Sequence, residues 1–583
     1  MNVKRVLLSW SVAVSFGVLF TTCTTRDDRN STAAKQLSPT GMEVGLAHIR
    51  SLDELVAERI RTRIEAACVV KEFRVRCEPV YASVALPGFY LRRLYRPAWN
   101  DKNGPTRMVD DLVSALRRAD FEGLRPKDYH LAAIENLLVA VRADVRSGGV
   151  IVPDRCAELD LLLTDAFLAY GSHFLAGRVN PETLQPEWVA NRRSADFAAV
   201  LETALTSRDV TGTLATLAPP QLGFRRLREA LVHHRELASR GGWPTLPDGV
   251  TLKRGDHGPP VAALRERLSL GGDLGAATWE DAELFDEALD QALKRFQRRH
   301  GLAADGTMGA ATHAELNVRA ERRMGQLELN LERWRWLPQD LGRRHILVNI
   351  AAFELEVVEE EEVVLAMRVV VGRPYQSTPV FSDTMEYIVL NPYWQVPGGI
   401  AVKEMLPRIK RDPTYLAQEN LRVFKGWGPE AREVDPGTVD WSAITPGDFP
   451  FRLRQDSGPL NALGRVKFMF PNKFNVYLHD TPARLLFEKT ERDFSHGCIR
   501  IQKPIELAVY LLRQDPRWNR DALLRAMDEV VNRSVSLPEP MPIHLLYWTA
   551  WVDKDGTIQF RPDIYGHDAS LSEALRAPPP TKE

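Results

Sequence analysis

The chain has 583 residues, a formal net charge of −1 at pH 7, and 44% hydrophobic and 26% charged residues. This length exceeds what a single hydrophobic core supports, so we expect three or four domains. The near-neutral charge excludes a general electrostatic affinity for nucleic acid, and the composition excludes extensive disorder.

The first residues have the pattern of an export signal. Lys4 and Arg5 precede an apolar run over Val6–Phe20, as in a secretory signal peptide. The run is shorter than the roughly 20 residues that a spanning helix needs. We therefore expect residues 1–26 to be a signal peptide or an N-terminal anchor, followed by a polar tether over 27–41. Lipidation of Cys23 remains an alternative, and only this segment or a lipid is expected to contact a membrane.

The other four cysteines have different expected roles. In an oxidising compartment Cys68 and Cys77 are candidates for a disulfide, although the sequence does not fix the pairing. Cys156 begins an apolar helix and is expected to be a packed thiol. Cys498 is the cysteine expected to stay reduced.

The first half of the chain has helical periodicity. In residues 42–245 the clearest signal is an apolar stripe at three- and four-residue spacing. A smaller unit over 250–318 begins with the capping sequence Gly255–Pro260 and turns again at Asp305-Gly306 before its last helix. We expect a mostly-α N-terminal domain and a three-helix module. The stripe consists of Leu159, Leu162, Leu163, Ala166, Phe167 and Tyr170.

From about residue 343 the periodicity becomes that of strands, so residues 343–535 are expected to form a mostly-β domain. The charged segment Glu359–Glu362 is expected to be a solvated hairpin turn and not a metal site. The β-rich runs are Ile346–Val358, Val363–Val371, Glu386–Leu390, Arg465–Phe470 and Phe474–Leu478.

An insertion rich in Pro, Gly and charge interrupts these strands at residues 397–448, with a helical piece over Val402–Lys410. Long insertions in compact domains are commonly functional lids or disordered segments. After a helix over Ile505–Arg513, residues 536–583 are expected to form a strand pair and a tail. The two strands are expected over Ile543–Val552 and Thr557–Phe560.

The strongest chemical signal is the segment Phe494-Ser-His-Gly-Cys-Ile-Arg500, preceded by His479 in Tyr477-Leu-His-Asp-Thr481. A thiol acts as a nucleophile in its thiolate form, so it needs a nearby base and donors for an oxyanion. His479 and His496 are candidate bases or orienting groups. The Gly497 and Cys498 amides are candidate oxyanion donors. The alternative is a buried cysteine beside two incidental histidines.

The spacing from His479 to Ser495-His-Gly-Cys-Ile-Arg500 resembles the signature of the L,D-transpeptidases, cysteine enzymes that cross-link bacterial peptidoglycan. Gly372-Arg-Pro-Tyr-Gln-Ser-Thr-Pro379 resembles a second motif of that family. Segments within 42–245 resemble the helical scaffold of its large periplasmic members, and 250–318 resembles a peptidoglycan-binding module. The implied fold is multidomain: a mostly-α scaffold, the three-helix module, and a mostly-β catalytic domain whose insertion is a helical or irregular cap.

The resemblance implies a reaction and a set of site residues. Cys498 would attack a tetrapeptide stem, release D-alanine and leave a thioester that an amine of a second stem resolves, giving a 3→3 cross-link. His479 is the implied base. Supporting or oxyanion roles fall to Ser495, His496 and Gly497, and candidate substrate contacts are Arg500, Tyr477 and Trp394. For Arg500 a structural ion pair is an open alternative, and for Tyr477 and Trp394 simple packing is one.

Other classes of function remain open at this stage. They are a zinc hydrolase using both histidines and Cys498, a non-catalytic wall-binding scaffold, and a carboxypeptidase or cross-link hydrolase in which water replaces the amine. We expect no cofactor and no metal. The expected partners are donor and acceptor stem peptides, with other cell-wall synthesis proteins as further candidates, and the expected location is the periplasm.

Overall fold

The computed structural model describes residues 51–67, 72–147, 151–190, 192–275, 279–426 and 428–580. The expected signal segment, the tether, Cys23 and Cys68 lie outside these residues, so lipidation and the Cys68–Cys77 pairing stay predictions. Within the described residues, no helix has both the length and the hydropathy needed to cross a membrane.

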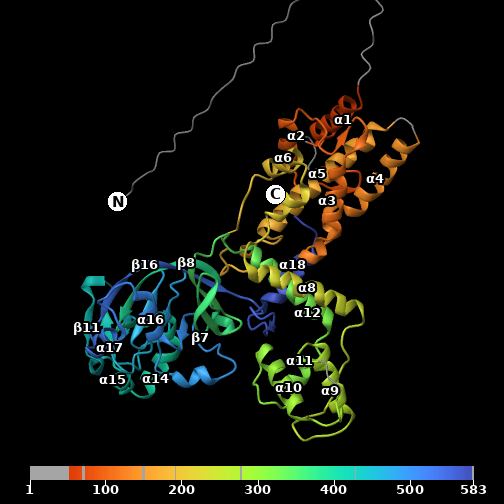
Figure 1. The fold of residues 1–583 in the computed structure, drawn as a ribbon. Helices are drawn as coiled ribbons and strands as arrows, with labels where there is room; N and C mark the ends of the chain where they lie inside the picture. Colours follow the sequence, from red (N-terminus) through yellow and green to blue (C-terminus); the bar gives the residue numbers. More distant parts are fainter. Residues whose placement is uncertain are drawn as a thin grey trace, which may run out of the picture. The chain divides into compact units, whose positions relative to one another are not determined.

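The N-terminal region is helical, as expected, and is built around one long central helix (Figure 1). Helix α5 is buried along most of its length and carries the predicted apolar stripe. Cys156 lies in it, fully buried, and burial raises the pKa of that thiol to about 12. The helices are α1 (Leu52–Ala67), α2 (Ala85–Arg92), α3 (Arg107–Arg117), α4 (Leu131–Arg146), α5 (Pro153–Ala176), α6 (Phe197–Ser207), α7 (Val210–Ala215) and α8 (Leu222–Ser239).

Two buried carboxylates of α5 tie the surrounding loops to this helix. Asp160 accepts hydrogen bonds from the backbone of Ala98 and Trp99 and from the side chain of Tyr90. Asp165 accepts from the backbone of Ala82 at 2.7 Å and from other groups of the same loops. Because buried charges are stable only with such partners, these contacts are structural. Two short hairpins complete the region: β1 (Arg74–Val75) with β2 (Glu78–Pro79), and β3 (Asn100–Asp101) with β4 (Gly104–Pro105).

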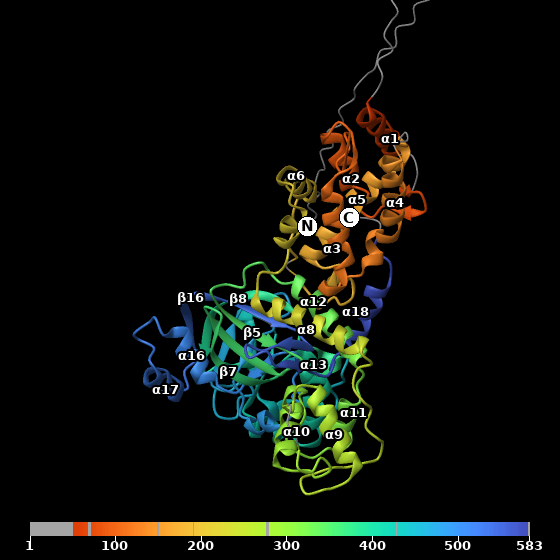
Figure 2. The same ribbon diagram turned by 45° about the vertical axis from the view of Figure 1, so that its right-hand side comes forward.

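The three-helix module consists of α9 (Pro259–Leu270), α10 (Glu287–Arg299) and α11 (Ala310–Leu316). Its own hydrophobic core contains the apolar positions singled out in the sequence, among them Leu264, Leu293 and Leu316. Helix α12 (Ala320–Arg335) follows and packs along α8, side by side in both views (Figures 1 and 2).

The β-rich region closes into an eight-stranded barrel in the order β13-β14-β15-β7-β6-β5-β16-β8. Closure removes every exposed sheet edge, and the inward positions of the strands form one continuous hydrophobic core. The strands are β5 (Arg344–Asn349), β6 (Glu354–Glu359), β7 (Glu362–Val370), β8 (Phe381–Leu390), β13 (Val466–Met469), β14 (Leu478–His479), β15 (Ile499–Ile501) and β16 (Arg533–Leu546).

Several strand predictions need correction. The run Ile346–Val358 is two strands, β5 and β6, joined by a tight turn. The expected Glu359–Glu362 hairpin turn is confirmed, with Glu360 and Glu361 at positive φ. The strand expected over Phe474–Leu478 is wrong for its first part, since Asn472 accepts backbone hydrogen bonds from Phe474 and Val476 and bends the chain. Such a side-chain turn competes with strand pairing, and only Leu478–His479 joins the sheet.

The insertion forms a subdomain with its own core, which we call the cap (residues 394–455). A four-stranded sheet in the order β11-β10-β12-β9 packs against the helical piece that the sequence predicted, so the cap is more regular than its Pro and Gly content indicated. Its elements are β9 (Trp394–Gln395), α13 (Gly398–Ile400), a π-helical turn (Ala401–Met405), α14 (Leu406–Arg411), α15 (Tyr415–Gln418), β10 (Leu421–Lys425), β11 (Arg432–Val434) and β12 (Phe451–Gln455).

The C-terminal prediction is correct in part. The hairpin of β17 (Ala550–Val552) and β18 (Ile558–Phe560) turns where expected. Residues before it, however, belong to β16, which pairs with both β5 and β8 and so completes the barrel. Helices α16 (Pro504–Leu512) and α17 (Arg520–Asp528) precede β16, and α18 (His567–Arg576) follows the hairpin.

Candidate active site

Strand alternation places five polar side chains together on the outer face of the barrel. Parallel strands β14 and β15 pair Leu478 with Ile499 and His479 with Arg500. Leu478 and Ile499 are fully buried in the core. Because successive side chains of a strand point to opposite faces, their neighbours Tyr477, His479, Cys498 and Arg500 face outward. Lys467 of β13 pairs with His479 and joins the same face.

The histidine of this cluster is held as a neutral base. His479 is only 4% exposed, and its Nδ1 donates to the carbonyl oxygen of Asp480 at 2.5 Å. This bond fixes the proton on Nδ1 and leaves Nε2 with a free lone pair. Burial, with the nearby charges of Arg500 and Lys467, lowers the pKa of His479 to about 3. The imidazole is therefore uncharged at neutral pH and able to accept a proton.

The cysteine of the cluster is a thiol at rest. Burial raises the pKa of Cys498, while hydrogen bonds from Tyr477 and the charges of Lys467 and Arg500 partly offset that rise. Its Sγ lies 4.0 Å from the carbonyl oxygen of Asn475. Among the described residues no hydrogen bond joins Sγ to His479, although both groups share the same charged neighbours. A neutral thiol and a neutral imidazole thus face the same surface of the barrel.

Lys467 is a site residue that the sequence analysis missed. Its ammonium lies 3.6 Å from the centre of the Tyr477 ring, and that ring packs edge-on against His479. Burial lowers the pKa of Lys467, and interaction with Cys498 opposes this shift. The sequence did contain one signal for this residue. Lys467 is a charged residue between the core positions Val466 and Phe468 of a predicted strand, and strand alternation turns its side chain outward.

The loop before the cysteine is held internally, which corrects one prediction. The Ser495 hydroxyl donates to the carbonyl oxygen of Cys498 at 2.5 Å and accepts from the amide of Gly497 at 3.1 Å. The Gly497 amide is therefore occupied and is not an oxyanion donor in this conformation. Gly497 itself is needed for backbone reasons, since its φ is +108°. The Ser495 side chain thus bonds two backbone groups of the loop that carries Cys498.

The second motif, Gly372–Pro379, packs directly on this loop. Gly372 and Ser495 form a parallel bridge, and the buried Thr378 links the two segments. Its hydroxyl accepts from the Gly372 amide at 2.9 Å and donates to the Gly497 carbonyl at 2.9 Å. A single side chain thus satisfies two backbone groups that would otherwise be buried without partners.

Residues far away in sequence hold the Thr378 segment from outside. The Tyr565 hydroxyl donates to the Gly372 carbonyl at 2.6 Å and accepts from the Thr378 amide at 3.3 Å. From the helical region, Val189 donates to the Val380 carbonyl at 2.9 Å, and Glu187 bonds Ser377. The sequence offered no signal for these contacts, because nothing local relates these positions.

The remaining predicted residues have mixed outcomes. Arg500 lies in the cluster, and among the described residues no carboxylate pairs with it, so the structural ion pair is not found. Its Nε is buried without a hydrogen-bond partner.

His496 does not contact His479; its Nε2 lies 2.5 Å from Glu404 in the π-helical turn of the cap. Trp394 pairs through β9 with β12 and packs against the cap core, which is the packing alternative.

The two histidines and Cys498 do not converge on a common point. His479 bonds its own neighbour's carbonyl, whereas His496 faces the cap. Among the described residues, no group of three or more His, Cys, Asp or Glu side chains could hold a metal ion. The arrangement therefore gives no support to the zinc-hydrolase alternative.

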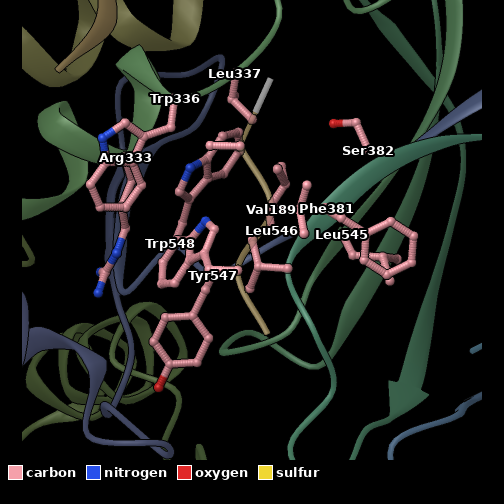
Figure 3. Close-up of a pocket in the computed structure, with 13 residues that line it drawn as sticks. Val189, Arg333, Trp336, Leu337, Phe381, Ser382, Leu545, Leu546, Tyr547 and Trp548 are labelled. Carbon is pink, nitrogen blue, oxygen red and sulfur yellow. The ribbon is translucent and has the colours of Figure 1, made fainter. Parts of the chain in front are cut away.

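A small cavity near the barrel end is surrounded by closely packed side chains, many of them aromatic (Figure 3). It has a volume of only about 20 Å³, space for about one water molecule. Trp188 and Trp336 meet edge-to-face with ring centres 5.0 Å apart, and the Arg333 guanidinium lies 5.2 Å from the Tyr547 ring. Arg333 also pairs with Asp568 at 2.6 Å. These contacts of Arg333 connect α12 with the end of β16 and with the C-terminal segment.

The site brings together a cysteine, an uncharged histidine with its proton fixed on Nδ1, and two flanking cations on a closed barrel. Family comparisons agree with it. Residues 343–518 match the "L,D-transpeptidase catalytic domain", 257–316 the "Putative peptidoglycan binding domain" and 84–231 the "Scaffold domain". The resemblance noted from the sequence is confirmed, and the chain contains an L,D-transpeptidase catalytic domain together with these two further domains.

Relatives with curated names are partial matches. A "Putative L,D-transpeptidase" of Haemophilus influenzae is 34% identical over 249 residues, covering 43% of this chain and 49% of that protein. The match thus spans about half the length of that relative. The N-acetylmuramoyl-L-alanine amidase CwlM of Mycobacterium tuberculosis is 37% identical over 86 residues, which are 14% of this chain and 21% of that protein.

Solved structures give weaker similarity. The L,D-transpeptidase (residues 123-326) of Xylanimonas cellulosilytica covers 51% of this chain and 98% of its own, at 16% identity and a TM-score of 0.16. An L,D-transpeptidase from Mycobacterium smegmatis covers 35% and 58%, at 15% identity and the same TM-score. At such TM-scores these structures support no conclusion about the fold, which is described from the barrel of this chain alone.

Proposed function

We propose that this protein is a cysteine L,D-transpeptidase that forms 3→3 cross-links between peptidoglycan stem peptides. The observation that carries the proposal is the shared outward face of Cys498 and His479 within a domain of this family. Donor and acceptor stem peptides are its substrates, and no cofactor is needed for the chemistry.

The first half-reaction acylates the enzyme. As Cys498 Sγ attacks the carbonyl after the third stem residue, its proton passes to Nε2 of His479. The sulfur–carbon bond forms, the carbonyl oxygen becomes an oxyanion, and the carbon–nitrogen bond then breaks. His479 gives its proton to the leaving amine of D-alanine, and a thioester remains on Cys498.

The second half-reaction transfers the acyl group. The side-chain amine of an acceptor stem attacks the thioester, His479 removes a proton from that amine, and the proton returns to the sulfur as the thiolate leaves. The cations of Lys467 and Arg500 favour the negative charge on sulfur in both directions. The Cys498 amide has no partner among the described residues and is the candidate oxyanion donor.

Arg500 also has the properties of a carboxylate binder. Its guanidinium has no acidic partner in the described part of the chain. Burial lowers the pKa of Arg500, and the positive charge of Arg373 lowers it further. A guanidinium can hold a carboxylate by two parallel hydrogen bonds. We assign to it the free carboxylate of the donor stem.

The decisive experiment joins product analysis with intact-protein mass spectrometry. Wild-type protein incubated with tetrapeptide stems should release D-alanine and form 3→3 dimers, and a carbapenem should add its mass to the protein. Cys498→Ala should do neither. Dimers formed by Cys498→Ala would overturn the proposal, and D-alanine release without dimers would identify the water-using carboxypeptidase alternative.

We also propose export to the periplasm, based on Lys4, Arg5 and the apolar run Val6–Phe20. A reporter enzyme that is active only outside the cytoplasm, fused after Glu583, should be active. Reporter activity confined to the cytoplasm would exclude both this location and the peptidoglycan substrate.

A further inference from the structure

A large cleft lies apart from the residues around Cys498. It has a volume of about 950 Å³, and its walls come from α8, α10, the turn after α9 and the β17–β18 hairpin. The residues lining it include none of the outward cluster on β13–β15. It is lined by parts of the scaffold region and of the peptidoglycan-binding module, and by a hairpin beyond all three family matches.

Specific contacts fasten the hairpin to the module. Arg561 donates to the carbonyl oxygen of Arg299 at 3.0 Å, and the Phe560 ring stacks on His300 with ring centres 5.4 Å apart. His300 in turn stacks on Phe296 of α10 at 3.9 Å. The floor of the cleft is therefore formed by side chains that pack closely against one another.

The floor of the cleft is uncharged. Burial lowers the pKa of His234 to about 4, and burial also holds the pKa of His300 well below its usual value. Trp243 lines the same region, half-buried, with its indole N–H bonded to the Val318 carbonyl at 2.9 Å. Charge in the cleft thus comes from its rim and from two buried arginines, Arg267 and Arg323.

The acidic groups of the cleft are mostly engaged elsewhere. Asp273 binds Arg299 through both oxygens, at 2.6 and 2.5 Å. In the hairpin, Asp553 accepts from Trp551 and Gln559, and Asp555 accepts from the Thr557 amide. Glu229, exposed on α8, is the remaining carboxylate of the lining.

Three arginines of α8 and α10, in contrast, lack acidic partners among the described residues, whereas Arg299 and Arg323 pair with Asp273 and Glu315. Arg226 on α8 and Arg298 on α10 make no ion pair there, and Arg295 bonds only the carbonyl oxygen of Asp273. Arg226 and His233 are seven residues apart on α8, so they share a face of that helix. The uncompensated charge of the cleft is positive.

A buried arginine adds an unused hydrogen-bond donor beside the cleft. Arg267 is 1% exposed, its guanidinium lies 3.9 Å from the Trp243 ring, and its Nε donates to the Leu316 carbonyl. Its Nη1 is buried without any hydrogen-bond partner. Burial lowers the pKa of Arg267 to about 9, and the carboxylates of Asp273 and Glu315 oppose this shift only in part, so its buried charge is incompletely offset.

We propose that this cleft binds an acidic peptide, with Arg226 and Arg298 pairing its carboxylates and Arg267 supplying buried positive charge beneath them. Guanidinium groups are suited to this role because they bind carboxylates bidentately. The identification of the peptide as a peptidoglycan stem rests on the proposed function. The cleft would then hold the wall substrate at a composite site, away from the thiol, that the module cannot form alone.

Calorimetric titration of the full chain tests this proposal, with Cys498→Ala as the background that prevents turnover. The probe is a synthetic tetrapeptide stem with free carboxylates. The double charge reversal Arg226→Glu/Arg298→Glu should remove one binding component or weaken it at least tenfold. Arg146→Glu/Arg525→Glu, two exposed helical arginines elsewhere, makes the same charge change and should leave the isotherm within twofold.

The outcomes separate this site from the catalytic one. The peptide with its carboxylates amidated should lose the same component in the Cys498→Ala background. Identical isotherms for the two double variants, or full affinity of the amidated peptide for the cleft, would overturn the proposal. With Cys498 intact, the wild-type protein should release D-alanine from saturating soluble peptide. Absence of release would refute the proposed reaction while leaving the cleft result valid.

Discussion

Replacing Thr378 by valine should loosen the cysteine loop while preserving its volume. The Thr378 side chain is 1% exposed and bridges the Gly372 amide and the Gly497 carbonyl, each at 2.9 Å. Valine has nearly the same shape but cannot donate or accept. Two buried backbone groups would then lose their partners, at about 1–3 kcal/mol each. The expected local destabilisation is therefore roughly 2–6 kcal/mol.

Hydrogen exchange followed by mass spectrometry measures this locally. Because about 1.4 kcal/mol corresponds to a tenfold change in an opening equilibrium, even the low end predicts roughly 30-fold faster exchange in peptides covering residues 371–380 and 494–500. Acylation by a carbapenem should slow in parallel, since the loop carries Cys498, the proposed nucleophile. Exchange in α10 should not change.

Two further variants make the test specific. Thr378→Ser keeps the hydroxyl and should recover most of the protection and the acylation rate. Thr438→Val removes an exposed hydroxyl of the cap that bonds only the Asp435 carbonyl, and it should be silent. If Thr378→Val exchanged and acylated like the wild type, the bridge would not be what positions the loop.

Three other expectations follow from the same site. The pKa of His479 is about 3 in the folded protein and 6.5 in the unfolded chain, so the rate of acylation should show no inflection near pH 6.5. The free energy of unfolding should fall as the pH drops from about 6.5 towards 3, because the unfolded chain binds that proton first. An inflection of the acylation rate at pH 6.5 would contradict the buried neutral base. Lys467→Met should move alkylation of Cys498 by iodoacetamide to higher pH, whereas an unchanged profile would exclude a charge effect on the thiol. Replacing residues 397–448 by a short Gly-Ser bridge should leave a folded barrel that loses cross-linking, and unchanged turnover would mean that the cap is not needed for the reaction.

The sequence predicted what depends on local pattern. The α5 stripe, the module core and the outward face of Tyr477 and His479 follow from periodicity, which acts through neighbouring residues. The same reasoning failed at Asn472, because a side-chain hydrogen bond to the backbone overrides the preference of the following residues for strand structure. Strand pairing partners were equally out of reach, since β14 meets β15 only after the intervening loop has folded.

The sequence pattern also could not show which hydrogen-bonding and charged groups already have partners in the fold. The Gly497 amide is an oxyanion candidate by sequence, yet Ser495 occupies it. Arg500 has two possible roles by sequence, and only the finished fold leaves it without a carboxylate partner among the described residues. Hydrogen-bond satisfaction is a property of the folded site, so these assignments need coordinates.

The barrel and its site also depend on residues well beyond the strands that carry the chemistry. Strand β16 pairs with β5 on one side and β8 on the other, so the barrel closes only when the chain has reached Leu546. Tyr565 then bonds the Gly372–Thr378 segment, and Val189 bonds the adjoining Val380 from the opposite end of the sequence. Because each contact orders the backbone beside the cysteine loop, the geometry of the thiol is determined by the scaffold and C-terminal segments together with the barrel, and residues 343–535 alone omit strand β16 almost entirely.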